Sequence, residues 1–244
     1  MFSRKASTVA SLSVLALCGA LAQPARAQTE SFDGVPGPGL PAGWTTSSVS
    51  FLPMPWEVEA YNPRSGPNAL VLRVYLDDAT SEATSPAYTV PASGRLRLRF
   101  YKSHWFETGR DGLRLQMSVD GGAFTEIVSA GGAFVTGGYT LRPDGASYGF
   151  WTAGAPFAYS ETIAETPTLT PGQQVRFRWE AFFDSSVASG DVFVDDVEVT
   201  AAAPAPPPPP PVIPTMTEWA MILLGTILAG GTALHLNRRR APGA

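Results

Sequence analysis

Residues 95–100 read RLRLRF and residues 175–183 read VRFRWEAFF, and these two stretches decide the fold. In both, apolar and charged side chains alternate with a period of two, which is the pattern of a β-strand that buries one face. Residues 113–119, LRLQMSV, repeat that pattern. Since each strand has one apolar and one polar face, the sequence predicts an all-β domain built as an antiparallel two-sheet sandwich.

Other segments of the same region extend this prediction. A turn is expected at the DGG of residues 120–122, and the chain returns as a partner strand at 124–128. The apolar runs at 70–76 and 192–199 are predicted to be strands as well. Nothing between residues 28 and 200 has a convincing helical period. The abundant glycine and proline, 24 and 23 residues, suit a domain with many turns.

Charge and cysteine content exclude several classes of function. The span from Glu30 to Glu218 holds all 21 acidic residues but only 11 of the 17 basic ones. Such a surface repels nucleic acid and anionic lipid, so neither is expected as a partner. The one cysteine is Cys18, near the N-terminus, and therefore the sequence predicts no disulfide, zinc–thiolate site or cysteine nucleophile in the domain.

The N-terminal segment 1–27 has the three parts of a secretory signal peptide. Arg4 and Lys5 are basic, residues 9–22 are mostly apolar, and the tripeptide at 25–27 is Ala-Arg-Ala. We expect cleavage before Gln28. Two alternatives are a lipoprotein signal at Cys18, which Leu17 disfavours, and a permanent helical anchor, which the short, serine-interrupted apolar run disfavours.

The C-terminal segment is predicted to reach a membrane. Residues 201–212 form a proline-rich linker that favours extended polyproline II. Residues 219–236 are 18 residues without a charge, and a helix of that length spans about 27 Å, close to the hydrocarbon thickness of a bilayer. The basic cluster that follows is expected to stay in the cytoplasm, with the domain on the other side.

Residues 213–244 resemble a known sorting signal. The motif Ile213-Pro214-Thr215-Met216-Thr217-Glu218-Trp219, the apolar helix, and then Arg238, Arg239 and Arg240 are similar to the IPTL-type C-terminal signals of Gram-negative bacteria, although Met216 replaces the usual leucine. The resemblance implies an exosortase-like membrane protease as a partner. It also implies an inner-membrane intermediate whose tail is removed before the protein reaches the cell surface. The alternative is a plain single-span anchor.

The domain at 28–200 resembles the MAM-like jelly-roll modules of bacterial exported proteins. The residues that carry this resemblance are Phe32-Asp33, Leu40-Pro41-Ala42-Gly43-Trp44, His104-Trp105-Phe106-Glu107, Asp111-Gly112, residues 118–124 (SVDGGAF) and residues 192–197 (VFVDDV). The resemblance implies a jelly-roll sandwich. Relatives of this kind are accessory domains of secreted peptidases, adhesins and surface proteins, and this chain lacks a peptidase domain.

Asp195 is the strongest candidate for a metal ligand. On a regular strand it shares a face with Phe193, Val197 and Val199, where an unpaired carboxylate is costly to bury. Similar jelly rolls bind structural calcium, and the partners here would be Asp196, Glu30 and Asp33. The alternatives are hydrogen bonds from the backbone, or a local bulge that turns Asp195 outward.

Two further groups are candidates for binding an extracellular glycan or matrix ligand. Arg97, Arg99 and Arg178 would join other arginines in a basic stripe for an anionic polysaccharide if their strands shared one sheet; otherwise they pair with carboxylates. Trp105, Phe106 and Trp151 fall near predicted loops, where exposed rings stack on sugars; otherwise they fill the ends of the sandwich.

Catalysis has little support in the sequence. His104 is the only histidine between the two terminal segments, and the chain has no Gly-x-Ser-x-Gly motif or phosphate-binding glycine loop. Glu57 and Glu59 are the carboxylates considered for glycoside hydrolysis. We therefore expect a non-catalytic, surface-displayed module that is adhesive, glycan-binding or matrix-associated. A glycan-active enzyme and a purely structural envelope component are the alternatives.

Overall fold

The structure of the chain is a computed structural model that describes residues 27–75, 78–143, 148–186, 190–204 and 216–239. It divides into two compact units, Met1–Pro204 and Ala205–Ala244, each described here by itself. The predicted signal peptide, most of the proline-rich linker, residues Ile213, Pro214 and Thr215 of the predicted sorting motif, and Arg240 lie outside the described residues.

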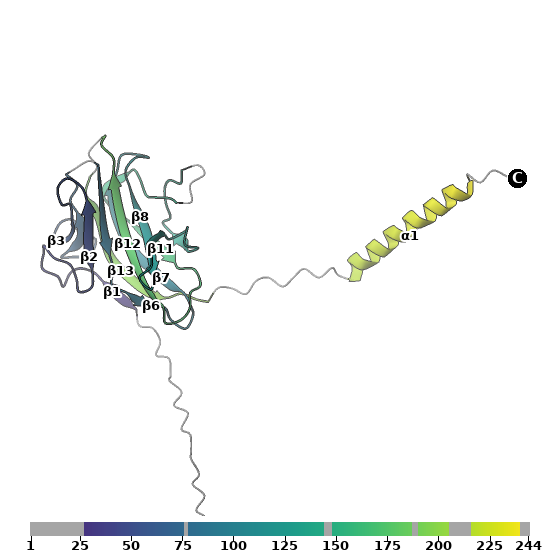
Figure 1. Cartoon of the computed structure of the whole chain (residues 1–244), viewed down its shortest axis with the longest axis horizontal. Helices are drawn as coiled ribbons and strands as arrows, with labels where there is room; N and C mark the ends of the chain where they lie inside the picture. Colours follow the sequence, from purple (N-terminus) through teal and green to yellow (C-terminus); the bar gives the residue numbers. More distant parts are fainter. Residues whose placement is uncertain (1–26, 76–77, 144–147, 187–189, 205–215, 240–244) are drawn as a thin grey trace, which may run out of the picture. The chain divides into compact units, whose positions relative to one another are not determined.

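The first unit contains two antiparallel sheets (Figure 1). Sheet A has seven strands, in the order β10-β11-β7-β13-β4-β3, with β1 also paired to β13. Their bounds are β1 (Gln28–Glu30), β3 (Trp56–Glu59), β4 (Ala69–Leu72), β7 (Leu96–Trp105), β10 (Ala133–Thr136), β11 (Gly154–Glu165) and β13 (Val192–Ala201).

Sheet B has six strands, in the order β2-β5-β12-β8-β9, with β6 also paired to β12. Their bounds are β2 (Thr45–Val49), β5 (Ala79–Thr84), β6 (Tyr88–Thr89), β8 (Gly112–Val119), β9 (Thr125–Glu126) and β12 (Gln174–Phe183). In both sheets, neighbouring strands far apart in the sequence lie side by side, as in the pairing of β12 with β5. The predicted antiparallel two-sheet jelly-roll sandwich is confirmed.

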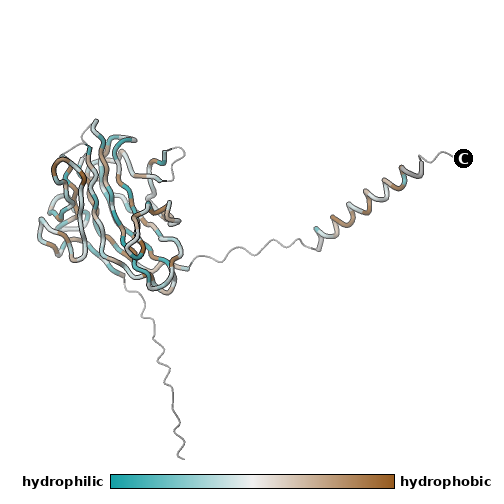
Figure 2. Tube along the Cα trace, viewed as in Figure 1, coloured by the Kyte–Doolittle hydropathy of each residue, from teal (hydrophilic) through white to brown (hydrophobic). Residues whose placement is uncertain are grey.

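The core lies between the two sheets and is rich in aromatic side chains. Trp179 of β12 packs edge-to-face against Phe100 of β7 at 5.3 Å between ring centroids, and it stacks on Trp44 at 5.5 Å. All three rings are buried. Figure 2 shows apolar and polar positions alternating along the strands. The period-two pattern therefore places one apolar row from each sheet in a shared interior.

Strand β13 departs from regular alternation in its middle. The register with β7 shifts between Asp195 and Glu198, and Asp196 has a positive φ of 48°. This is a β-bulge, which reverses the faces along one strand. Val194 and Val197 therefore both point into the main core, whereas Phe193 packs into a separate cluster on the outer face of sheet A.

The domain extends slightly beyond the predicted boundary at residue 200. Strand β13 runs to Ala201, and the backbone N–H of Ala202 donates to the carbonyl of Arg95 at 3.0 Å. The side chain of Ala202 is buried. The ordered part of the sandwich therefore includes at least two residues that the sequence pattern assigned to the linker.

The second unit contains the helix α1, Met216–Arg239. Within it, Glu218–Leu236 is long and apolar enough to cross a membrane. This agrees with the span of 219–236 predicted from composition. In this helix Met216, Glu218 and Trp219 of the predicted motif lie in the first turn, and Arg238 and Arg239 lie at the opposite end.

Candidate binding face on sheet A

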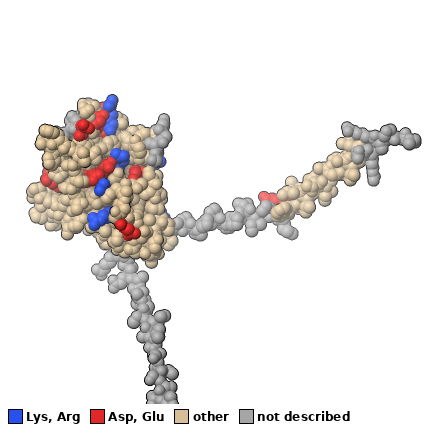
Figure 3. Space-filling model, viewed as in Figure 1, with Lys and Arg blue, Asp and Glu red and all other residues tan. Residues whose placement is uncertain are grey.

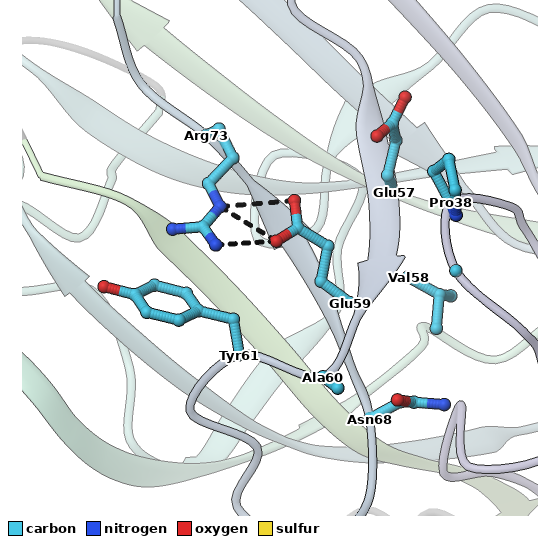
Figure 4. A pocket seen from close by; sticks show the side chains of 9 residues that line it. Pro38, Glu57, Val58, Glu59, Ala60, Tyr61, Asn68 and Arg73 are labelled. Carbon is cyan, nitrogen blue, oxygen red and sulfur yellow. Dashed lines mark hydrogen bonds and ion pairs between the residues drawn. The ribbon is translucent and has the colours of Figure 1, made fainter.

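A cleft of about 490 Å³ opens beside strands β3 and β4 at the edge of sheet A (Figure 4). We call it the β3 cleft. Glu57 and Glu59 lie two residues apart on β3, so both project from the outer face while Trp56 and Val58 are buried. The residues that line it are Gly37, Pro38, Glu57, Val58, Glu59, Ala60, Tyr61, Asn68 and Arg73.

Arg73 organises one wall of the β3 cleft. Its Nη2 donates to Glu59 Oε2 at 2.6 Å, and its Nη1 donates to Asp191 Oδ2 at 2.8 Å. Its guanidinium also lies 3.6 Å from the centroid of the Tyr61 ring. Hydrogen bonding to Glu59 raises the pKa of Arg73. Two carboxylates therefore hold the guanidinium in place, and the guanidinium in turn packs on the Tyr61 ring beside the cleft.

A cluster of rings continues from the β3 cleft across the outer face of sheet A. Tyr61 and Phe157 meet edge-to-face at 5.8 Å between centroids, and both rings contact Phe193 of β13. The hydroxyl of Tyr159 donates to the carbonyl of Asn62, which fastens the loop that carries Tyr61. Phe157 is 51% exposed. We call Tyr61, Phe157, Tyr159 and Phe193 the ring platform.

Trp105 lies on the same face as the ring platform. It ends β7, pairs with Gly154 of β11, and is 49% exposed. Its exposure agrees with the predicted role of an accessible ring. For Phe106 and Trp151 the prediction of exposed rings was wrong, because both are buried in the core at 3% and 1% exposure. The alternative reading, that such rings fill the sandwich, holds for these two.

The arginines do not form one basic stripe. Arg97 and Arg99 project from the outer face of sheet A, whereas Arg178 belongs to β12 of sheet B. Each of the three is paired with carboxylates: Arg97 with Glu165, Arg99 with Glu198 and Glu161, and Arg178 with Glu82. Figure 3 shows basic and acidic side chains next to one another on the face turned to the viewer. The prediction of a basic stripe for an anionic polysaccharide was therefore wrong.

Asp195 lies on the outer face of sheet A because of the bulge, so the predicted grouping with Val197 and Val199 was wrong. Its carboxylate accepts the backbone N–H groups of Arg64, Ser65 and Asp196 at 2.9, 3.1 and 2.7 Å. Burial raises the pKa of Asp195 to about 6. Both alternatives considered from the sequence, backbone hydrogen bonds and a bulge, are thus present.

The other candidate calcium ligands also have partners in the protein. Asp196 accepts from Arg64 and Ser65, Asp33 accepts from the N–H of Asn68, and Glu30 accepts from the N–H of Phe32. Across the described ranges, no three His, Cys, Asp or Glu side chains are grouped to hold a metal ion. The four carboxylates thus accept hydrogen bonds from donors of the protein itself. Calcium binding stays a prediction, and melting curves with and without a chelator test it.

His104 is placed poorly for catalysis. It lies near the C-terminal end of β7 with its side chain buried. Its ring stacks on Phe106 at 4.9 Å between centroids, and its Nδ1 has no hydrogen-bond partner among the described residues. Burial, together with the charge of Lys102, lowers the pKa of His104 to about 4. The ring is therefore neutral at physiological pH and separated from solvent.

Lys102 is a buried residue that the sequence analysis did not single out. It follows Leu96, Leu98 and Phe100 on the inner face of β7 and is 2% exposed. Its Nζ donates to Thr162 Oγ1 at 2.9 Å and to Ser160 Oγ at 3.1 Å, and it lies 4.5 Å from the Trp151 ring centroid. Continuing the period-two pattern by one step would have predicted this inward position.

No protein-family model matches the chain, and no curated protein matches it. Among solved structures, the chain is similar to a carbohydrate-binding module, TmCBM61, in complex with β-1,4-galactotriose (TM-score 0.43, 14% identity, 66% of this chain and 90% of that chain). It is also similar to the K1 cleaved adhesin domain of Lys-gingipain from Porphyromonas gingivalis (0.45, 16%, 73% and 99%). A third is the CBM22-1 xylan-binding domain of Paenibacillus barcinonensis Xyn10C (0.40, 11%, 73% and 95%).

Proposed function

We propose that the domain is a non-catalytic glycan-binding module that uses the β3 cleft and the ring platform. The observation that carries this proposal is the exposed Phe157 ring held edge-to-face against Tyr61, next to a cleft lined by carboxylate, amide and guanidinium groups. Binding sites for small ligands combine apolar surface with a few fixed polar groups in this way.

The chemistry of a sugar ring matches this combination. A pyranose has an apolar face of C–H groups that stacks on an aromatic ring, and a rim of hydroxyls that need hydrogen-bond partners. Phe157 and Trp105 supply the rings, and Glu57, Glu59 and Asn68 supply acceptors and donors. The groups are set by sheet strands and by ion pairs, so little side-chain freedom is lost when a ligand binds.

The first experiment measures binding of the full chain, in detergent micelles, to an array of polysaccharides. Phe157→Ala and Trp105→Ala are expected to weaken binding by about 5- to 30-fold, the factor that corresponds to the loss of roughly 1–2 kcal/mol of ring contact. Phe51→Ala is the matched control, because Phe51 is 96% exposed in the segment between β2 and β3, away from the ring platform. Equal losses in all three variants, or no binding by the wild type, would contradict the proposal.

A glycan-active enzyme is the second candidate, because Glu57 and Glu59 line the same cleft. Glu59 is engaged in an ion pair with Arg73, so Glu57 is the carboxylate of the cleft that remains available to act on a glycosidic bond. Release of reducing ends during incubation with any bound polysaccharide, abolished by Glu57→Gln, would favour the enzyme.

We also propose that the domain is delivered by the tail at 213–244, through an exosortase-like protease. The apolar span Glu218–Leu236 and the basic residues after it support this, together with the resemblance of the motif before it. Mass spectrometry of surface-extracted protein tests the proposal. The mature form should lack peptides that contain Arg238–Arg240, and their recovery from most of the surface pool would instead indicate a plain membrane anchor.

A further inference from the structure

We infer that the glycan bound at the β3 cleft is an uncharged polysaccharide and that polyuronates and sulfated chains are rejected, with Glu57 as a residue that sets this specificity. The inference rests on the proposed glycan-binding function and names its substrate class. It follows from how the charged groups on the outer face of sheet A are paired.

Recognition of an anionic sugar needs a basic group that is free to contact it, preferably an arginine with its two-pronged donor geometry available. Five arginines project over this face or its rim, and each forms an ion pair within the part of the chain that the structure describes. The pairs are Arg64–Asp196, Arg73–Glu59 and Arg73–Asp191, Arg95–Glu165, Arg97–Glu165, and Arg99–Glu198.

Arg73 shows the consequence inside the β3 cleft itself. It is the one basic residue among those that line the cleft. Its Nε and Nη2 contact Glu59, its Nη1 contacts Asp191, and one face of its guanidinium covers Tyr61. A carboxylate or sulfate on a ligand would have to displace one of these partners and leave another acidic group without its counter-charge. Such an exchange gives no net gain in charge pairing.

Glu57 adds an acidic group that lacks this compensation. Within the described ranges it has no ion pair, whereas its neighbour Glu59 is bound to Arg73. Figure 4 shows the Glu57 carboxylate directed away from the Arg73–Glu59 pair. A free carboxylate accepts hydrogen bonds from sugar hydroxyls, but it repels a uronate carboxylate at the same position. The two acidic residues and one basic residue of the cleft therefore favour ligands without negative charge.

The experiment compares each neutral polysaccharide that binds with its own C6-oxidised derivative, in which only the primary alcohols become carboxylates. Binding to the full chain in detergent micelles is measured at low salt and at about 0.5 M salt, where the screening length falls to about 4 Å. The oxidised derivative should bind at least about fivefold more weakly at low salt, the factor for roughly 1 kcal/mol of repulsion near contact. The difference should shrink at high salt.

Two variants locate the effect. Glu57→Gln keeps the shape of the side chain without its charge, and the ratio of the two dissociation constants, oxidised derivative over neutral polysaccharide, should fall below about twofold. Glu82→Gln is the control, because it removes the same charge from the outer face of sheet B. Equal or tighter binding of the oxidised derivative by the wild type would overturn this inference and leave the proposed function standing. Absence of binding to every neutral and oxidised chain would overturn the proposed function itself.

Discussion

At the scale of single residues, Lys102 is the least expected feature of the core. Its ammonium group lies among Thr162, Ser160 and Trp151, and no carboxylate in the described structure forms an ion pair with it. Burial lowers the pKa of Lys102 to about 8. Because a lysine in the unfolded chain titrates near 10.4, the folded state binds the proton more weakly than the unfolded state does. The charged form of Lys102 therefore destabilises the fold at neutral pH.

Replacing Lys102 with methionine should stabilise the domain at pH 7. The variant keeps the apolar stem and removes the free-energy cost of burying the charged ammonium group, roughly 3 kcal/mol. About 1 kcal/mol of stability is lost, because the hydroxyls of Ser160 and Thr162 no longer have a hydrogen-bond partner. The net gain should be about 1–2 kcal/mol, which raises the melting temperature by several degrees. Thermal melts of both proteins at pH 7 measure the difference.

The same variant should also remove a pH dependence. Wild-type stability is expected to rise relative to Lys102→Met as the pH increases from about 8 to about 10, since the unfolded chain holds the proton longer. Arg176→Met is the control, because Arg176 is exposed on the same sandwich and should show a change below about 0.5 kcal/mol at every pH. A constant difference between wild type and Lys102→Met across this range would show that folding does not lower the pKa of Lys102.

The candidate site could be predicted from sequence only in part, and the reason is visible residue by residue. Trp105 was correctly expected to be accessible, but Phe106 next to it points inward, because neighbours on a strand face opposite sides. Tyr61, Phe157 and Arg73 were not singled out. Tyr61 lies in a loop, Phe157 lies in the irregular part of β11, and Arg73 follows the end of β4, so that only the folded sheet brings them together. Period-two patterns carry no information about such non-local contacts.

At the scale of single elements, the bulge in β13 determines what faces the candidate site. Without the register shift between Asp195 and Glu198, the strand would turn either Phe193 or Val197 to the wrong face. Asp196 holds the bulge with a φ of 48°, a conformation that Asp and Asn tolerate and that β-branched residues avoid. The alternation VFVDDVEV hides this, because a double aspartate looks like ordinary strand polarity.

Asp196→Val should therefore be costly, and Asp196→Asn should not. The valine variant is expected to lose about 1–2 kcal/mol more than the asparagine variant, because both lack the charge that pairs with Arg64 but only valine strains the backbone. Glu198→Val is the control on the same strand, two residues on, where no positive φ occurs. Chemical denaturation of the three variants measures the differences, and similar losses at both positions would contradict a strained bulge.

The strands differ in how well the sequence revealed them. The long strands β8, β12 and β13 were predicted close to their observed bounds, whereas the pattern that predicted β7 ended at Phe100 and the strand continues to Trp105. Strand β5 was missed because its inward residues are small, namely Ala79, Ser81 and Ala83. Strand β11 was missed because its first half is exposed on both faces, where the chain bulges away from β7. Pattern reading thus detects strands that bury large side chains and overlooks those that do not.

At the scale of the whole molecule, the β-sandwich and the apolar helix belong to two separate compact units. The sandwich keeps its own core within residues 28–202, and the apolar helix α1 lies in the other unit. Composition predicts such a division, because a proline run separates the alternating segments from the apolar tail. The exact end of the sandwich could not be predicted from composition. Ala201 and Ala202 look like linker residues, but Ala201 ends the last strand and Ala202 is buried against the sandwich.

A chain covering residues 28–204 should fold alone, with a β-type circular dichroism spectrum and one cooperative melt. A chain that ends at Thr200 should melt several degrees lower, because it loses the buried Ala202 and the hydrogen bond from its N–H to Arg95. Comparing the two melting temperatures checks the boundary. If the shorter chain is equally stable, residues 201–202 add nothing to the sandwich.

The order of strands within the sheets also affects whether copies of the domain associate through their sheet edges. The strands of eight residues or more, β7, β8, β11, β12 and β13, each have a neighbour on both sides, while β2, β3, β9 and β10 at the sheet edges have five, four, two and four residues. An open edge invites the backbone of another molecule to add a strand, and short edges give it little length to pair with. Copies of the domain at high local concentration should therefore resist edge-to-edge aggregation and stay individually dispersed.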